Sequence, residues 1–265
     1  MEEINSDIGN IMNWSKQNEL LLNEMKTVVL VVSNSYTLEE IKSFTVNING
    51  ITIHASDEMK CLGITLDSKL QWSAHINNVA KKCYQRIRAL YAVKPYLSHE
   101  NLKILGQSLV LSLLYYMSAI WGRAKKSLLK SVEKVLRSLA RLVMSARKFD
   151  PIAKIITQDL KWMFPNYLCQ FTTLCMTFKL LHYDIPYFND YYTKKSLVHE
   201  HTTRQTSDLH INFKPCNKYG RSMFYYNSIM SWNNLPRDIK NITSFVSFKR
   251  NLRKHLLEEQ ASTLT

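Results

Sequence analysis

Five cations recur at steps of four or three residues in KKSLLKSVEKVLRSLARLVMSARK, and they are the side chains best spaced to act together. They are Lys126, Lys130, Lys134, Arg137 and Arg141. At 3.6 residues per turn, this spacing places all five on one face of a helix. Glu133 is the only acid in the stretch, so we expect the cations to stay un-neutralised along the helix and to attract a polyanion.

The opposite face of the same predicted helix is apolar. It carries Leu128, Val132, Val135, Leu139 and Leu142. A helix of about 22 residues spans about 33 Å, which is long enough to follow several phosphates of a duplex. An ordinary solvated face is the alternative, but such faces usually mix charges of both signs. We therefore expect this helix to bind nucleic acid through its phosphates, which position a duplex without specifying its sequence.

The charge of the whole chain is unevenly distributed and supports this interpretation. Residues 68–147 hold 15 Lys and Arg against 2 acids, whereas residues 1–67 hold 4 against 10. Four more cations lie on a helix predicted over about 72–92, namely Lys81, Lys82, Arg86 and Arg88. A basic block of this kind indicates a polyanionic partner, either nucleic acid or an anionic membrane surface.

Catalytic and metal-binding patterns are missing from the sequence. It contains no GxGxxG, GxxxxGK, HExxH, GxSxG or CxxC, and no two aspartates are adjacent. Cys169, Cys175 and His182 share a helical segment, but their spacing fits no standard zinc pattern, so we expect buried thiols and no metal site. The five cysteines and the acidic, polar first residues predict a reduced intracellular compartment, the cytoplasm or the nucleus.

Residues 1–67 are predicted to form a small α+β piece with one helix and about four strands. Isoleucines at helical spacing predict a helix over 3–18, and the β-branched run 26–33 predicts a buried strand. Asn49-Gly50 lies at the centre of an alternating stretch and predicts a tight hairpin. A further strand is expected over 60–67.

The rest of the chain is predicted to be helical, which makes the fold class α+β. We expect a helical region over 68–183, an irregular loop or linker over 184–218 and a helical tail over 219–265. Ser98 is expected to cap a helix. Residues 104–122 have no charge over 19 residues, so a membrane anchor is an alternative, although their polar side chains favour a buried helix in a protein without a membrane span.

Four motifs, read in chain order, resemble the reverse transcriptases of non-LTR (LINE-type) retrotransposons, nearest to the jockey, CR1 and RTE groups. The first is a W…N.L.LN..KT pattern at Trp14, Asn18, Leu20, Leu22, Asn23, Lys26 and Thr27. The second is an LG..LD..L.W..HI pattern at Leu62-Gly63, Leu66-Asp67, Leu70, Trp72 and His75-Ile76. The others are Tyr116 with Trp121-Gly122, and a tail at Trp232-Asn233, Leu235-Pro236, Ile239, Phe245 or Phe248, and Leu252.

This resemblance implies roles for matching positions. Residues 1–67 would be the end of the polymerase palm, and the helices from 72 onward would be the thumb, which holds a template–primer RNA/DNA duplex. Lys26 would contact the phosphates of the incoming nucleotide or donate a proton. Leu62 and Gly63 would form the primer-gripping turn, where glycine allows the backbone to approach nucleic acid closely.

The sequence also departs from the family. In the family, paired aspartates hold two Mg²⁺ ions, and this sequence lacks them. Asp57 and Asp67 are separated by a whole strand, so we do not expect them to replace that pair. We therefore expect a truncated polymerase that binds no cofactor and is inactive alone, with a missing palm-and-fingers segment or a second copy as a further partner. Cys61 stands where the family has Phe or Tyr. A helical nucleic-acid-binding or assembly module unrelated to polymerase chemistry remains the alternative.

Overall fold

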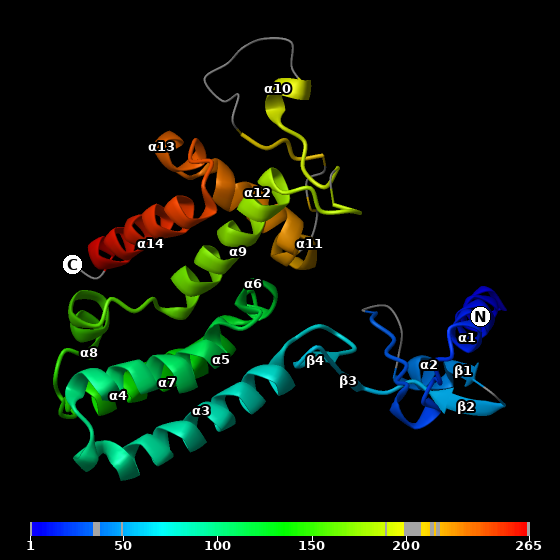
Figure 1. Cartoon of the computed structure of the whole chain (residues 1–265), viewed down its shortest axis with the longest axis horizontal. Coiled ribbons are helices and arrows are strands. Elements are labelled where there is room, and N and C mark those ends of the chain that lie inside the picture. The colour runs from blue at the N-terminus through cyan, green and yellow to red at the C-terminus, as the bar shows by residue number, and fades with distance from the viewer. Residues whose placement is uncertain are drawn as a thin grey trace. The chain divides into compact units, whose positions relative to one another are not determined.

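The computed structural model describes residues 2–33, 38–48, 50–188, 190–198, 208–212, 215 and 218–263. The chain forms two compact units, Met1–His75 and Ile76–Thr265. Within the described residues, strands that pair into sheets belong to the first unit, and the second unit is built from helices (Figure 1). The α+β fold class predicted from the sequence is confirmed.

The first unit contains one long helix and a hairpin close to those predicted. Helix α1 spans Glu2–Gln17, followed by the 3-10 turn η1 at Glu24–Lys26 and the short helix α2 at Leu38–Ser43. Strands β1 (Thr45–Ile48) and β2 (Ile51–His54) pair antiparallel, with Ile48 opposite Ile51. Gly50 has a φ of 82°, as a two-residue turn requires, and Asn49 lies outside the described residues.

The single strand expected over 60–67 is instead a second hairpin. Strand β3 (Glu58–Cys61) pairs antiparallel with β4 (Ile64–Asp67), and Leu62 and Gly63 form the turn with φ angles of 46° and 82°. The apolar positions shift by one residue across the turn, from Met59 and Cys61 to Ile64 and Leu66, which a single continuous strand would not show. A positive φ at a leucine is unfavourable, so residue preference does not predict this turn, but the resemblance to non-LTR reverse transcriptases does place a turn at Leu62 and Gly63, and the structure has one there.

The buried strand predicted over 26–33 is wrong. Val29 makes one isolated bridge with Ala55, while the side chains of Val28 and Val32 are exposed. The β-branched run has the right propensity, but a strand also needs a partner along its length. The two described hairpins each pair within themselves, so only single backbone contacts reach this segment, such as Ser56 N–H to the carbonyl of Val29 at 2.8 Å.

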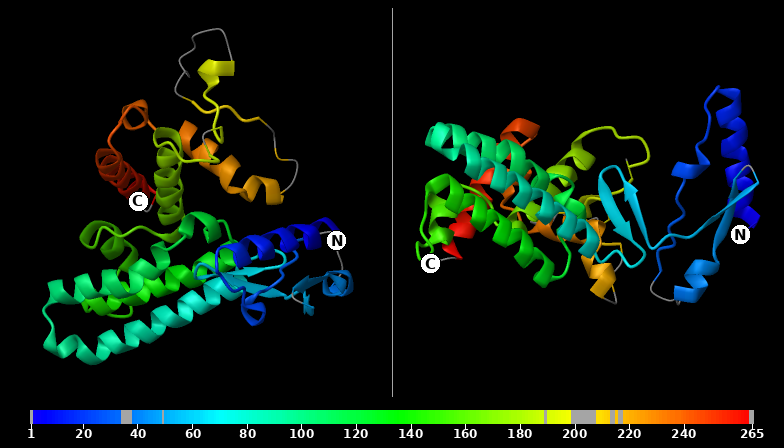
Figure 2. Two further views of the ribbon diagram at one scale, coloured as in Figure 1. Left: turned by 45° about the vertical axis from the view of Figure 1, so that its right-hand side comes forward. Right: turned by 90° about the horizontal axis from the view of Figure 1, so that it is seen from below.

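Helices α3, α4 and α7 form one layer of the second unit, in which they lie side by side (Figures 1 and 2). Their bounds are α3 Ser73–Val93, α4 His99–Gly106 and α7 Lys126–Met144, with the 3-10 turn η2 (Lys94–Tyr96) between α3 and α4. Ser98 caps α4 as predicted, because its side chain accepts a hydrogen bond from Asn101 N–H at 3.2 Å. The apolar face predicted for 126–144 is buried at Val132, Val135, Leu139 and Leu142.

The uncharged stretch 104–122 is not one continuous helix. After α4 it forms the π-turn η3 (Gln107–Leu111) and two short helices, α5 (Ser112–Tyr115) and α6 (Ser118–Trp121), with Met117 between them at a φ of 53°. Among the described residues, no helix has both the length and the apolarity needed to cross a bilayer.

Helices α12 and α14 pack against α9, which spans Pro165–His182. Before it lie α8 (Ile152–Lys154) and the π-turn η4 (Ile155–Asp159). After it lie α10 (Lys195–Val198), α11 (Lys218–Ser222), α12 (Phe224–Asn233), α13 (Arg237–Lys240) and α14 (Phe245–Ser262). Parts of the predicted linker 184–218, among them 199–207 and Cys216, lie outside the described residues.

Stacked aromatic rings join α9, α12 and α14 into one core. The ring of Phe248 lies 4.4 Å from that of Phe178 and 5.8 Å from that of Trp232, measured between centroids. Gln260 on α14 is buried and closes the other end, because its amide accepts from Phe164 N–H at 2.7 Å and donates to the carbonyl of Trp162 at 2.9 Å. The tail is therefore part of the second unit's core.

Candidate nucleic-acid interface

Helix α7 presents three lysines to solvent. Lys126, Lys130 and Lys134 are all exposed, one turn apart along the helix. The opposite face is packed into the core of the unit at Val135 and Leu139. Because burial of that face fixes the rotation of the helix, the lysines form a row of positive charge along about 12 Å of the axis.

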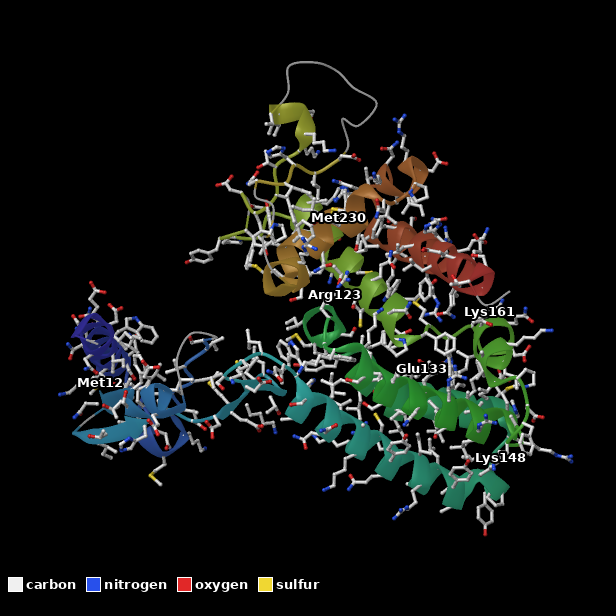
Figure 3. The ribbon with its side chains drawn as sticks, turned by 180° about the vertical axis from the view of Figure 1, so that it is seen from behind. Met12, Arg123, Glu133, Lys148, Lys161 and Met230 are labelled. Carbon is white, nitrogen blue, oxygen red and sulfur yellow. The ribbon has the colours of Figure 1, made fainter. Side chains whose placement is uncertain are left out.

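Arg137 differs from the lysines, because Glu133 pairs with it. Arg137 Nε and Nη2 lie 2.8 Å and 2.6 Å from Glu133 Oε1, and the guanidinium lies 5.4 Å from the ring centroid of Phe164 (Glu133 is labelled in Figure 3). The expectation that the cations of this helix are not neutralised is therefore wrong at Arg137. Its charge is shared with an acid one turn earlier, which the i, i+4 spacing could have indicated.

Arg141 is held at the end of α7. Its Nη1 donates to the backbone carbonyl of Arg147, and its side chain is half-buried. This contact fixes the guanidinium near the last turn of the helix and leaves its other N–H groups available to a further acceptor.

The four cations predicted on α3 point in different directions. Lys81, Lys82 and Arg88 are exposed. Arg86 turns inward, where its Nη1 donates to the carbonyl of Leu109 in the π-turn η3. A π-turn interrupts the regular i→i−4 ladder of a helix and so needs an extra donor of this kind. Arg86 therefore also supports the packing of α3.

A groove between α3 and α7 brings two of the predicted cations together. It has a volume of about 530 Å³ and is lined by Tyr84, Ile87, Arg88, Tyr91, Ser138 and Arg141. Arg88 comes from α3 and Arg141 from α7, and no carboxylate lines the groove. Sequence reasoning missed the two tyrosines, although their spacing with Arg88 (i, i+4 and i+7) places all three on one helix face.

A second cleft of about 510 Å³ lies where α6 ends and α9 and α12 approach each other. Arg123 and Met230, both labelled in Figure 3, line it together with the amides of Asn166, Gln170 and Asn234. Burial lowers the pKa of the Arg123 guanidinium, which nevertheless remains charged at neutral pH. This cleft is polar and basic, and Lys126, the first lysine of the exposed row on α7, also lines it.

The residues predicted to meet a primer or a nucleotide lie in the first unit. Leu62 and Gly63 form the turn of the β3–β4 hairpin, with the Leu62 side chain exposed. Lys26 is exposed at the end of η1, where its backbone N–H bonds to Asn23 Oδ1 at 3.1 Å. The roles of these three residues remain predictions.

Asp67 is a turn anchor, as its position after a strand suggests. Its Oδ1 accepts from the N–H groups of Lys69 at 3.1 Å and Gln71 at 2.9 Å, and its Oδ2 accepts from Trp72 N–H at 2.8 Å. Backbone amides thus already occupy both oxygens. Among the described residues, no three His, Cys, Asp or Glu side chains gather, and the prediction that this chain binds no metal cofactor remains a prediction.

Several residues of the last two motifs belong to the core of the second unit. Trp121 is buried, and its Nε1 donates to the carbonyl of Tyr116 at 2.9 Å. Asn233 holds the backbone of Leu209 on both sides, accepting from its N–H at 2.8 Å and donating to its carbonyl at 3.0 Å. Trp232 and Leu235 are buried beside it. These residues position helices.

The chain matches a protein of Drosophila melanogaster described as "Probable RNA-directed DNA polymerase from transposon BS", with 29% identity over 119 residues. This chain is similar to a transposon polymerase. The match covers 43% of this chain and 13% of the length of that protein. It supports a relationship to the reverse transcriptases of transposons. No family model matches the chain, and no solved structure matches it.

Proposed function

We propose that this chain is the palm-end and thumb part of a non-LTR (LINE-type) retrotransposon reverse transcriptase, and that it holds a template–primer duplex without catalysing its extension. The row of exposed lysines on α7, Lys126, Lys130 and Lys134, carries the proposal. The similarity to a transposon polymerase supports it. The order of the four motifs favours the non-LTR group and the C-terminal part of its polymerase.

The lysines would act on the duplex as point charges. An ammonium group attracts a phosphate without geometric selection, so binding should be independent of sequence and should weaken with salt. Each neutralised phosphate contributes about −0.9 to the log–log slope of affinity against salt for B-form duplexes. If about five phosphates are neutralised, the slope is about −4 to −5.

Charge reversal on α7 tests this proposal. The variant Lys126→Glu/Lys130→Glu/Lys134→Glu should bind a blunt RNA/DNA hybrid at least ten times more weakly and reduce the magnitude of the salt slope by about three, measured by fluorescence anisotropy. The matched control is Lys249→Glu/Arg250→Glu/Lys254→Glu, which makes the same charge change at exposed positions of α14. A folded α7 variant that binds as tightly as the parent would overturn the proposal.

The catalytic part of the proposal has its own test. The chain contains no adjacent aspartates, and Asp67 is engaged by backbone amides. Incubated with a template–primer, nucleotides and Mg²⁺ or Mn²⁺, the purified chain should add no nucleotide above the background of a reaction without protein. Template-directed incorporation would show that this part is wrong.

A further inference from the structure

The groove between α3 and α7 combines aromatic rings with cations, which the row of lysines on α7 does not. Tyr84 and Tyr91 are about half-exposed, at 43% and 51%, and Ile87 forms a buried floor between them. Exposed rings beside arginines are the composition of sites that hold unpaired bases, because a base stacks on the ring while the arginine meets the phosphate.

The spacing of the α3 residues fits a strand more closely than a single small ligand. Tyr84 and Tyr91 are seven residues apart, which places them on one face and about 10.5 Å apart along the axis. Arg88 lies between them on the same face. Two rings separated by a cation can each take a base while the cation meets a linking phosphate.

The α7 side of the groove adds a second cation in a fixed position. Arg141 is held by the carbonyl of Arg147, so little of its freedom remains to be lost when it meets a phosphate. Helix α3 contains no Asp or Glu at all, and no carboxylate lines the groove. The groove volume of about 530 Å³ is within the range of nucleotide-sized sites.

We propose that the α3–α7 groove binds unpaired nucleotides of a single strand, with bases stacked on Tyr84 and Tyr91 and phosphates at Arg88 and Arg141. This rests on the proposed function, which places nucleic acid on the same helices. It adds a second mode of contact. The row of lysines on α7 meets the phosphates of the duplex, and the groove receives a single-stranded extension through its bases.

The test compares two strands that carry the same phosphates. One is a labelled oligonucleotide of about 12 nucleotides, and the other is an abasic backbone of equal length. The parent protein should bind the base-bearing strand more tightly, by roughly tenfold for each stacked base. The variant Tyr84→Ala/Tyr91→Ala should lose this preference and keep its affinity for the abasic strand.

Two further variants separate stacking from general damage to the fold. Tyr84→Phe/Tyr91→Phe keeps both rings and should keep the preference for bases. Tyr183→Ala removes a ring of matched exposure, 50%, outside the groove and should leave the preference unchanged. Both variants and the alanine pair should bind the blunt hybrid as the parent does.

Equal affinity of the parent for the two strands would overturn the inference, as would an alanine pair that keeps the preference. A competition experiment gives a further check. If polyglutamate displaces the labelled base-bearing strand as effectively as the unlabelled strand does, the groove binds charge alone and the inference is wrong. Loss of blunt-hybrid binding on reversing the α7 lysines tests the proposed function separately, so the two failures are distinguishable.

Discussion

The sulfur atom of Cys169 occupies the space into which a side chain at Gly122 would project. A Cβ on Gly122 would lie 2.0 Å from Cys169 Sγ and 2.4 Å from the carbonyl oxygen of Ser118. The end of α6 therefore approaches α9 as closely as the backbone allows. Gly122 has a negative φ, which any residue can adopt, so the requirement for glycine comes from the lack of space for a side chain.

The substitution Gly122→Ala should destabilise the second unit. The added methyl group must displace α6 from α9, and overpacking of this kind costs about 1–3 kcal/mol of unfolding free energy, or more where the backbone must shift. Thermal melts followed by circular dichroism measure the change. Gly106→Ala, which meets a movable Leu139 methyl at 3.1 Å, should cost less, and Gly9→Ala, with nothing within 4 Å, should cost nothing. A Gly122→Ala protein as stable as the parent would contradict the close approach.

Lys240→Met should destabilise the same unit through a buried ion pair. Lys240 Nζ lies 2.8 Å from Asp208 Oδ1 and donates to the carbonyl of Asn233 at 2.7 Å, with both side chains at least nine-tenths buried. Removing the cation leaves Asp208 with the more distant Lys195, so we expect a loss of about 3–5 kcal/mol in unfolding free energy. Lys254→Met breaks an exposed pair with Glu258 and should cost under about 1 kcal/mol in the same denaturant titration. Equal losses in the two variants would refute the difference in burial.

Asp67→Ala should loosen the turn that leads into α3. Three backbone N–H groups lose their acceptor, so the amides of Gln71 and Trp72 should exchange with solvent at least tenfold faster, as measured by hydrogen exchange. Asp67→Asn keeps one acceptor oxygen and should show a smaller change. Asp57→Ala is the control, because the three N–H groups described in this turn bond to the carboxylate of Asp67. Unchanged exchange in Asp67→Ala would mean that the turn does not depend on the carboxylate.

The buried cysteines should resist alkylation and make the fold sensitive to alkali. Burial raises the pKa of the Cys83 and Cys169 thiols from 9.0 to about 12 and that of Cys175 to about 11. At about pH 8 iodoacetamide should therefore modify the exposed Cys61 first, and Cys83 and Cys169 only after unfolding, as peptide mass mapping can show. Modification of Cys83 in the folded protein at the rate of Cys61 would contradict its burial.

The same shifts fix the sign of the pH dependence. Above pH 9 the unfolded chain releases thiol protons that the folded chain retains. The unfolded state then binds fewer protons than the folded state, so stability falls as the pH rises from 9 toward 12. Denaturant titrations across this interval should show the midpoint moving to lower denaturant.

Periodicity predicts the helices whose buried face can be identified within their own sequence. The apolar positions of α7, such as Val135 and Leu139, define its buried face, and Ser98 marks the start of α4. The pattern fails where a partner decides the outcome. The run 26–33 has strand propensity but lacks a neighbouring strand among the described residues, and the turn at Leu62-Gly63 places a leucine at a positive φ, which residue preference does not predict.

The sequence predicts the charge of the candidate interface, but it does not predict which cationic side chains point to solvent. Lys126 and Lys134 are exposed to solvent, as their positions on the charged face predict. Arg86 and Arg137 find acceptors, Leu109 and Glu133, and only the structure shows how far each guanidinium is engaged. Tyr84 and Tyr91 look like core residues in a sequence, since an aromatic stripe at helical spacing usually is one.

The π-turn η3 has a consequence for changes in chain length. A π-turn holds one more residue per turn than an α-helix, so deleting one residue within Gln107–Leu111 restores regular helix locally. The same deletion in α7 would rotate every later residue by about 100° and turn Leu139 away from the core. Insertions and deletions between related chains should therefore collect at η3, where Arg86 donates to the carbonyl of Leu109.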